Sequence, residues 1–313
     1  MSLILALALL GVSWMSPVPD PTAPSFSLLA REEWKFWTEH DSLAKLISRM
    51  QKLPTLPALY VEMQSELAKP DASIECVGAL ISKDPAMTAK ILRLVNSAVF
   101  GLSAKVCVPA EAVIYLGVAR TTSLVLAAAL TRDFEEIVCA HFSHEEFWQH
   151  SVAVGNFARV IALCETQDYR VADVAFTAGL LHDIGKLLLA ANLPELYGQI
   201  VSEAQRRPMP IQQVEKEILG GNHGELGACL LGKWGLPGAI LEAIAWHNCP
   251  AKSADQKFSA LTAVHMANIF AHETASRASG RLFGECDSGY LERLGLKDHC
   301  DFWREVCGLT GSS

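Results

Sequence analysis

Most of the chain has the hydrophobic spacing of amphipathic α-helices, and no segment alternates apolar and polar residues as a half-buried strand does. In KDPAMTAKILRLVNS, Asp84 stands where an N-cap is expected and Pro85 follows at the first helical position. Similar helical spacing runs through ASIECVGALIS, PAEAVIYLGVARTTSLVLAAAL and ELGACLLGKWG. The face predicted for the helix after Pro85 consists of Met87, Ile91, Leu92 and Val95. The pattern predicts an all-α, multi-helix bundle.

A second helical half is predicted to begin near residue 140. Ser143 and Glu146 have capping-box spacing ahead of the long amphipathic segment EFWQHSVAVGNFARVIALCE. We therefore expect an N-terminal extension at residues 1–48, a helical domain at 49–275 with halves at 49–140 and 141–275, and short packing helices at 276–313.

The first residues, MSLILALALLGVSWMSP, are apolar like the core of a signal peptide and include an ALA that resembles a cleavage site. They lack a basic region, because the first Lys or Arg is Arg31, and the apolar run is short for a membrane span. A targeting or anchoring role, a misplaced start codon, a cloning remnant and a helix docked on the body remain open. The Pro-rich spacer SPVPDPTAPS follows.

Composition narrows the class of protein. A chain of 313 residues that is 50% hydrophobic and 19% charged can bury a substantial core. The net charge of -8 and the absence of a Lys/Arg-rich run argue against direct nucleic-acid binding, and membrane binding is not expected. The nine cysteines form no C-x-x-C pair or disulfide framework, so a reducing cytoplasm fits best.

The segment TAGLLHDIGKLLLA places His182, Asp183 and Lys186 in an apolar run. Unpaired polar groups in a core cost several kcal/mol, so these residues need partners. Adjacent side chains on one helix diverge by about 100°. His182 and Asp183 could therefore contact one common atom only if that atom were a metal ion bound between them at the side of the helix. Three of the other histidines on helices of the same half are candidate partners, although each taken alone is typical of a half-buried imidazole bonded to a carbonyl: His150, His223 and His247.

Several motifs together resemble a known family. FWQHSVAVGNFARVIA, AFTAGLLHDIGKLLL, NHGELGACLLGKWGLPGAILEAIAWHN and LTAVHMANIFA, in this order, resemble the HD superfamily of metal-dependent phosphohydrolases, and most closely its HD-GYP and HDOD branches. The earlier segment from LPTLPALYVEMQ to NSAVFGL, followed by VPAEAVIYLG, resembles the N-terminal part of the HDOD domain. The resemblance runs from about Leu53 to about Ala271, and the GYP stretch is absent.

The resemblance implies a set of ligands. In the catalytic relatives, histidines and the His-Asp pair hold two or more metal ions, and the Asp of the pair bridges them. Lys186, one turn beyond His182, would face the site and neutralise a phosphate oxygen. The matching ligands in this chain would be His150, His182, Asp183, His223 and His247.

Two positions depart from the catalytic pattern. Asn248 stands where those enzymes tend to have a second histidine, and Asn268 replaces their late aspartate. An amide oxygen is a weak, neutral ligand. We therefore expect at most one divalent ion, Zn, Fe or Mn, held by Asp183, His223 and His247; a metal-free, hydrogen-bonded cluster stays open.

The remaining candidates favour structural roles. His141 and His144 are expected in a loop or first turn, and His265 and His272 share a helix face with Asn268 but favour packed or solvent-edge positions. The cysteines are expected to be small buried hydrophobes without an activating base.

Two functions follow from the resemblance. The first is an HDOD-type signalling or regulatory module that binds a protein partner or a small phosphorylated ligand through a degenerate metal site, with weak or absent hydrolysis. The alternative is a metal-dependent phosphohydrolase acting on a phosphodiester or nucleotide, in which Asp183 bridges metals and Lys186 holds a phosphate.

Overall fold

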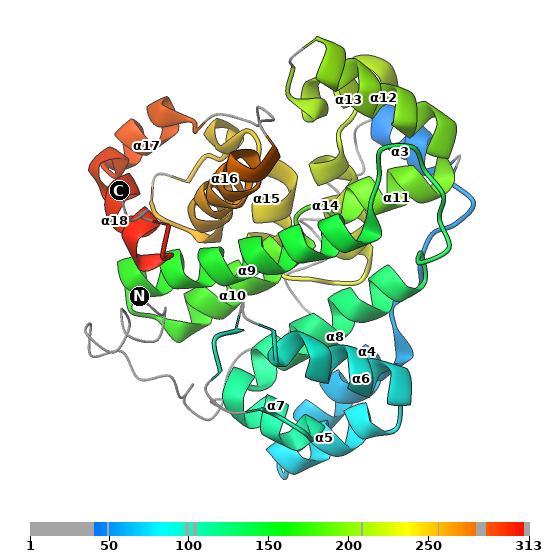
Figure 1. Ribbon diagram of the computed structural model, residues 1–313, viewed down its shortest axis with the longest axis vertical. Helices are drawn as coiled ribbons and strands as arrows, with labels where there is room; N and C mark the ends of the chain where they lie inside the picture. The colour runs from blue at the N-terminus through cyan, green and yellow to red at the C-terminus, as the bar shows by residue number, and fades with distance from the viewer. Residues whose placement is uncertain are drawn as a thin grey trace. The chain divides into compact units, whose positions relative to one another are not determined.

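The computed structural model describes residues 41–48, 50–97, 100–102, 105–207, 209–255, 257–279 and 286–309. All regular secondary structure in these ranges is helical, so the predicted all-α class is confirmed (Figure 1). The apolar N-terminal segment and the Pro-rich spacer lie outside the described residues, and their role stays a prediction.

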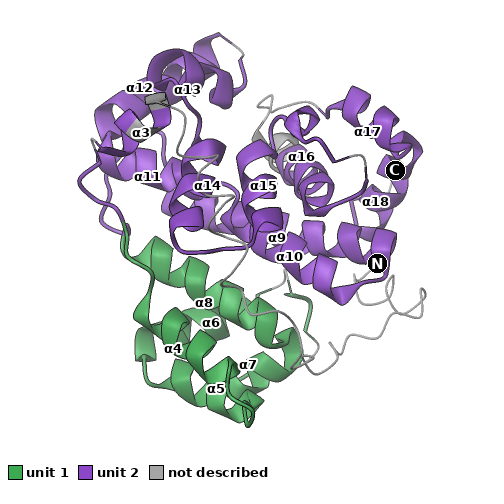
Figure 2. Ribbon diagram, turned by 180° about the vertical axis from the view of Figure 1, so that it is seen from behind, with its two compact units in different colours: residues 1–24, 54–133 green, residues 25–53, 134–313 purple. Residues whose placement is uncertain are grey.

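The described residues divide into two compact units, coloured separately in Figure 2. Unit 1 contains residues 54–133, and unit 2 contains residues 41–53 and 134–309. The helices of unit 1 are α4 (Ala58–Leu67), α5 (Ile74–Ser82), α6 (Pro85–Val95), α7 (Pro109–Leu116) and α8 (Val118–Arg132).

Helix α6 begins as predicted. The Asp84 carboxylate accepts a hydrogen bond from the Met87 backbone N–H at 3.0 Å, and Pro85 takes the first helical position, where its missing N–H has no cost. The predicted buried face is wrong at one position, because Leu94 is buried and Leu92 is only half-buried. Leu92 instead lines a surface pocket of unit 1.

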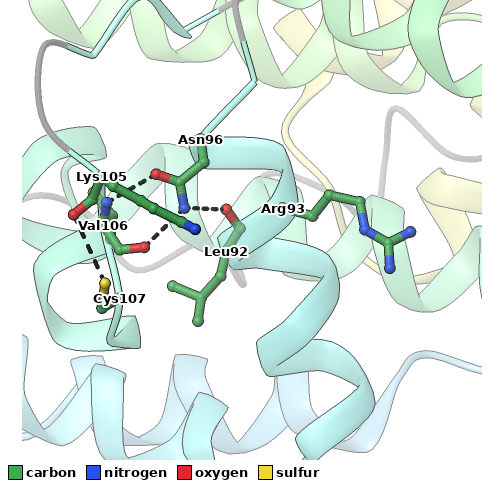
Figure 3. Close-up of a pocket in the computed structure, with 6 residues that line it drawn as sticks. All are labelled: Leu92, Arg93, Asn96, Lys105, Val106 and Cys107. Atoms are coloured by element: carbon green, nitrogen blue, oxygen red, sulfur yellow. Dashed lines mark hydrogen bonds between the residues drawn. The ribbon is translucent and has the colours of Figure 1, made fainter.

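That pocket, of about 560 Å³, is built around the Asn96 side chain (Figure 3). The Asn96 amide donates to the carbonyls of Leu92 and Val106, each at 2.8 Å, and its oxygen accepts from the Val106 N–H at 2.8 Å. Asn96 thus fastens the segment around Val106 to the end of α6. Arg93, Lys105 and Cys107 complete the lining.

The segment from Pro109 to Arg132, in which the sequence shows helical spacing, forms two helices. Gly117 separates them with φ of +82° and ψ of 158°, and the chain bends by 119° between α7 and α8. Glycine adopts this backbone conformation without the steric cost that a Cβ would bring. After the bend, α8 contacts α4, α6 and α7, and its residues from Arg120 to Thr131 are buried.

Unit 2 holds the remaining helices. They are α3 (Asp41–Ser48), α9 (His144–Thr166), α10 (Tyr169–Leu181), α11 (Ile184–Asn192), α12 (Pro194–Arg206), α13 (Ile211–Leu219), α14 (His223–Lys233), α15 (Gly238–Trp246), α16 (Ala260–Ser279), α17 (Ser288–Leu294) and α18 (Cys300–Val306). The Ser143 hydroxyl accepts from the Glu146 N–H at 3.2 Å, so α9 starts where the sequence predicted. Figure 1 shows α9 and α10 side by side, with α15 and α16 packed against them.

One described stretch, Tyr169–Asn192, is long and apolar enough to cross a membrane by its length and composition. It comprises α10 and α11, and 83% of its most apolar window is buried inside the fold. A core helix passes the same test, and this stretch forms the centre of unit 2.

Candidate metal centre

Five helices of unit 2 bring the predicted ligands to one place. His150 lies on α9, His223 is the first residue of α14, and Asn268 lies on α16. His182 caps the end of α10, and His247 caps the end of α15. The structure therefore brings together all five residues that the sequence singled out, along with the departing position Asn268.

The His-Asp pair lies at a junction between helices, not within one helix as we expected. Helix α10 ends at Leu181, and Asp183, with φ of -100° and ψ of 7°, takes the N-cap position of α11. His182 Nε2 lies 3.3 Å from Asp183 Oδ2.

The two carboxylate oxygens of Asp183 face two pairs of histidines. Oδ2 lies 3.3 Å from His182 Nε2 and 3.7 Å from His150 Nε2. Oδ1 lies 3.3 Å from His223 Nε2 and 3.7 Å from His247 Nε2. Within each of the two triplets, the possible ligand atoms lie within 4.8 Å of one another. Asp183 is common to both, so the His150–His182 group also has an anionic ligand, which the sequence-based expectation did not credit to it.

Three of the imidazoles are held with Nε2 directed at Asp183. Their Nδ1 atoms lie within hydrogen-bond distance of acceptors, which assigns the proton to Nδ1 and leaves a lone pair on Nε2. The acceptors are the Gly179 carbonyl for His182 at 2.7 Å, Glu215 Oε2 for His223 at 2.6 Å and the Ile244 carbonyl for His247 at 2.7 Å. Histidines that bind metals are oriented in this way.

Two atoms of the cluster have no hydrogen-bond partner although they are fully buried: His182 Nε2 and Asp183 Oδ1. Buried lone pairs without a donor carry a desolvation cost, which a cation placed among them would remove. A carboxylate with unprotonated imidazoles is also a suitable ligand set for Zn, Fe or Mn. The residues present therefore fit a divalent metal ion.

Both asparagines touch the ligand nitrogens. Asn248 Nδ2 lies 2.6 Å from His247 Nε2 and 3.1 Å from His223 Nε2. Asn268 Oδ1 lies 3.0 Å from His150 Nε2. The departures from the catalytic pattern thus lie inside the cluster, where they add amide groups and no charge.

Lys186 lies in the site as predicted, and it pairs with the carboxylate. Its Nζ is 2.7 Å from Asp183 Oδ2, and its side chain is 19% exposed. His272 also reaches the site, since its ring stacks on His150 with centroids 4.5 Å apart. His265 is packed: its Nδ1 lies 2.7 Å from the His247 carbonyl.

Sequence reasoning missed three residues that fix His223 and the start of its helix. Glu215 is fully buried, and its Oε2 accepts from both Nδ1 and the backbone N–H of His223, at 2.6 and 2.8 Å. Asn222 and Glu225 form the capping box that starts α14. The sequence contains a signal for each. The N-x-x-E spacing of Asn222 and Glu225 is that of a capping box, and Glu215 lies four residues after Ile211, on the same helix face.

Burial and neighbouring charges set the protonation states of the cluster. Burial alone would raise the pKa of Asp183, but His182 and Lys186 hold it well below its usual value. Burial lowers the pKa values of His150 and His247 well below the usual value. Burial also opposes protonation of His223, but the charge of Glu215 and the hydrogen bonds to Asp183 and Glu215 together raise that pKa. The cluster is therefore built around an ionised aspartate and mostly neutral imidazoles.

These shifts predict a loss of stability on acidification of the metal-free protein. Burial lowers the pKa of His272 to about 3, and those of His150, His247 and His265 are lowered as well. Below about pH 6.5 the unfolded chain then binds more protons than the folded one, so stability falls with pH. His223, with a raised pKa, acts in the opposite direction and offsets one of the four.

We expect the free energy of unfolding to fall by about 1–3 kcal/mol between pH 7 and pH 5.5, measured by urea unfolding in the presence of a chelator. In this range Asp and Glu contribute little. His272→Gln removes one of the depressed imidazoles and should reduce the loss. A free energy that stays constant over this range would contradict the protonation states given above.

An all-helical unit in which histidines converge on a His-Asp pair is the arrangement that the HD superfamily resemblance implied. The family model of the HDOD domain matches residues 53–250, and the chain belongs to the HDOD domain family.

Three solved structures share the fold. An HDOD domain protein with unknown function from Geobacter sulfurreducens has a TM-score of 0.65 at 22% identity, over 86% of this chain and 97% of that one. A protein from Shewanella amazonensis SB2B that is called a phosphohydrolase has a TM-score of 0.63 at 23% identity, over 87% and 97%. One from Marinobacter aquaeolei VT8 that is called a signal transduction protein has a TM-score of 0.65 at 18% identity, over 93% and 67%.

A curated relative, an uncharacterized protein of Treponema pallidum (strain Nichols), is 26% identical over 226 residues, which are 72% of this chain. The chain spans only 43% of the length of that relative.

Proposed function

We propose that this HDOD protein is a regulatory module of signal transduction whose histidine cluster holds at most one divalent metal ion. One observation carries the proposal: the two positions that depart from the catalytic pattern place neutral amides directly against the ligand nitrogens of His150, His223 and His247. The site keeps the geometry of a metal centre and has lost charge needed for two ions.

Charge balance favours one ion over two. Asp183 is the one carboxylate among the described residues that faces the Nε2 atoms, while Glu215 is turned to Nδ1 of His223. Lys186 already neutralises Asp183 Oδ2 on the side of His150 and His182. Oδ1 keeps its lone pairs toward His223 and His247. These three residues, Asp183, His223 and His247, would therefore hold a single Zn, Fe or Mn ion.

A bound ion would supply a Lewis acid at this cluster. The side chains around such an ion would orient its ligands. Glu215 fixes the tautomer of His223, and Lys186 holds one oxygen of Asp183. Among Lys186 and the five candidate ligands, His150 and Lys186 have the most exposed side chains, at 17% and 19%, so an anionic group such as a phosphate would approach there.

The module is proposed to act in the cytoplasm by binding a protein partner or a small phosphorylated ligand. One relative by fold is called a signal transduction protein. The net charge of -8 disfavours nucleic acid as the partner.

The alternative function, a metal-dependent phosphohydrolase acting on a phosphodiester or nucleotide, has a specific observation in its favour. Both triplets of possible ligands are present, and they share Asp183 as a two-metal centre requires. Another relative by fold is called a phosphohydrolase. In this function Lys186 would leave part of its pairing with Asp183 to hold a phosphate oxygen.

Counting metals separates the two functions. Protein purified from metal-supplemented medium is expected to contain at most about one ion per chain, and Asn268→Asp should raise this toward about two. The substitution puts a carboxylate 3.0 Å from His150 Nε2, at nearly constant volume. Two ions in the wild type, or no gain in the variant, would show that residue 268 is not the missing ligand.

The same preparations test activity. We expect the wild type to hydrolyse cyclic dinucleotides and generic phosphodiesters far more slowly than about 1 per second, the lower end of ordinary enzymatic turnover. Turnover at or above that rate, lost in Asp183→Ala, would establish the phosphohydrolase instead. Asn268→Asp is expected to raise whatever hydrolysis the wild type has.

A further inference from the structure

The end of unit 2 brings together two cysteines outside the histidine cluster. Cys286 lies just before α17, Cys300 is the first residue of α18, and the two thiols are close enough for each to shift the pKa of the other. The Cys286 Sγ also lies 3.6 Å from the Met266 sulfur on α16. Both thiols are half-buried, so small solutes can reach them. The expectation that the cysteines are all inert buried hydrophobes is therefore wrong here.

Charged groups around the pair are also fixed. Arg304, one turn beyond Cys300, bonds both carboxylate oxygens of Glu273 at 2.8 and 3.2 Å, and its guanidinium lies 5.0 Å from the centre of the Phe270 ring. These contacts hold a positive charge close to Cys300.

The two thiols are unequal. The interaction with the Cys286 thiol, and after it the charge of Arg304, lower the pKa of Cys300 to about 7 against the effect of burial. The same interaction and burial raise the pKa of Cys286. At neutral pH Cys300 thus has substantial thiolate character, while Cys286 keeps its proton. A reactive thiolate beside a second thiol is the arrangement of a reversible redox site.

We propose that Cys300 and Cys286 form a redox modification site that hydroperoxides oxidise to a disulfide. The Cys300 thiolate attacks one oxygen of hydrogen peroxide; an S–O bond forms, the O–O bond breaks, and hydroxide leaves. The sulfur of Cys286 then attacks the sulfenic sulfur of Cys300, the S–S bond forms, and the S–O bond breaks. Hydroxide leaves in this step too and takes up the Cys286 proton as water. Two electrons pass from the two sulfurs to the peroxide.

The modified segment is connected to the histidine cluster by two hydrogen bonds. The Asp287 backbone N–H, next to Cys286, donates to His265 Nε2 at 3.1 Å. His265 Nδ1 therefore carries the proton and donates to the His247 carbonyl at 2.7 Å. A change in the backbone at Cys286 acts directly on this connection. Disulfide formation itself does not depend on whether the cluster binds metal.

Peptide mapping tests the proposal. The reduced full-length protein is treated with hydrogen peroxide in slight excess, free thiols are blocked with N-ethylmaleimide, and tryptic peptides are analysed by mass spectrometry without reduction. The expected product is one disulfide between LFGECDSGYLER and DHCDFWR, the peptides that contain Cys286 and Cys300. It should disappear after reduction.

Variants assign the two roles. In Cys286→Ser, Cys300 should accumulate as sulfenic acid that a dimedone probe traps, and in Cys300→Ser no disulfide should form at Cys286. Cys249, which is exposed, serves as the matched control and should react at least about tenfold more slowly than Cys300. Thermal unfolding of each variant shows that it is folded. Disulfides scattered over other cysteines, or oxidation of Cys249 ahead of Cys300, would overturn the proposal.

Discussion

Asp183→Ala is expected to lower bound metal from about one ion per chain to below about 0.1, because this residue supplies the carboxylate of both ligand triplets. Imidazoles alone would remain at each position, without an anionic ligand to offset the charge of the ion. Elemental analysis and titration calorimetry with zinc and manganese measure the effect. Asp173→Ala is the matched control: Asp173 is a carboxylate of the same unit that pairs with Arg159 at 3.2 Å.

The loss of metal should not come from unfolding. In the metal-free protein, Asp183→Ala removes a buried charge and lets Lys186, already 19% exposed, turn toward solvent. We expect the free energy of unfolding without metal to change by no more than about 1–2 kcal/mol, since the substitution removes both the ion pair and the desolvation of the carboxylate. A variant that binds metal as the wild type does would refute the assignment of Asp183. A variant that fails to fold would refute the expected energy balance.

The fold was predictable where short-range chemistry sets a helix end. The side chains of Asp84 and Ser143 accept hydrogen bonds from the first free backbone N–H groups of their helices. The ring of Pro85 fixes the backbone in a helical conformation. The break at Gly117 could not be predicted in this way. Its neighbours keep helical spacing, and the direction of the bend depends on where α8 finds apolar partners within unit 1.

The candidate site was predictable in its members and not in its details. Each histidine alone favours a structural role, and only the resemblance to a family gathers His150, His182, His223 and His247 into one cluster. The pairing of Lys186 with Asp183, and of each Nδ1 with its acceptor, depends on side-chain positions that no spacing specifies. The roles of these residues as metal ligands stay predictions until metal is measured.

The proximity of Cys286 and Cys300 could not be predicted from the sequence at all. They are separated by α17 and a short turn, and nothing in their spacing resembles a known thiol motif. Their contact arises because α17 and α18 both fold back onto unit 2, where Met266 and Glu273 of α16 meet Cys286 and Arg304. Tertiary packing alone produces the pair.

Close packing of two helix starts underlies the cluster, and it makes Gly185 the most sensitive glycine of the site. A Cβ at Gly185 would lie 1.9 Å from the His223 carbonyl oxygen and 2.7 Å from its carbonyl carbon. Both atoms belong to the backbone, so no side-chain rotation relieves the overlap, and α11 and α14 must separate. Asp183 is the N-cap of α11 and His223 is the first residue of α14, so these two residues would move apart with the helices.

We therefore expect Gly185→Ala to destabilise unit 2 by about 3–5 kcal/mol or more, the range of overpacked or broken cores. Gly289→Ala is the matched control, because a Cβ there meets nothing closer than Asp287 Oδ1 at 3.6 Å. Within α17 this change should stabilise by up to about 1 kcal/mol through helix propensity. Urea and thermal unfolding of the two variants measure both effects. A Gly185→Ala protein that melts within about 2 °C of the wild type, a shift worth less than about 1 kcal/mol, would show that the two helix starts are not packed this closely.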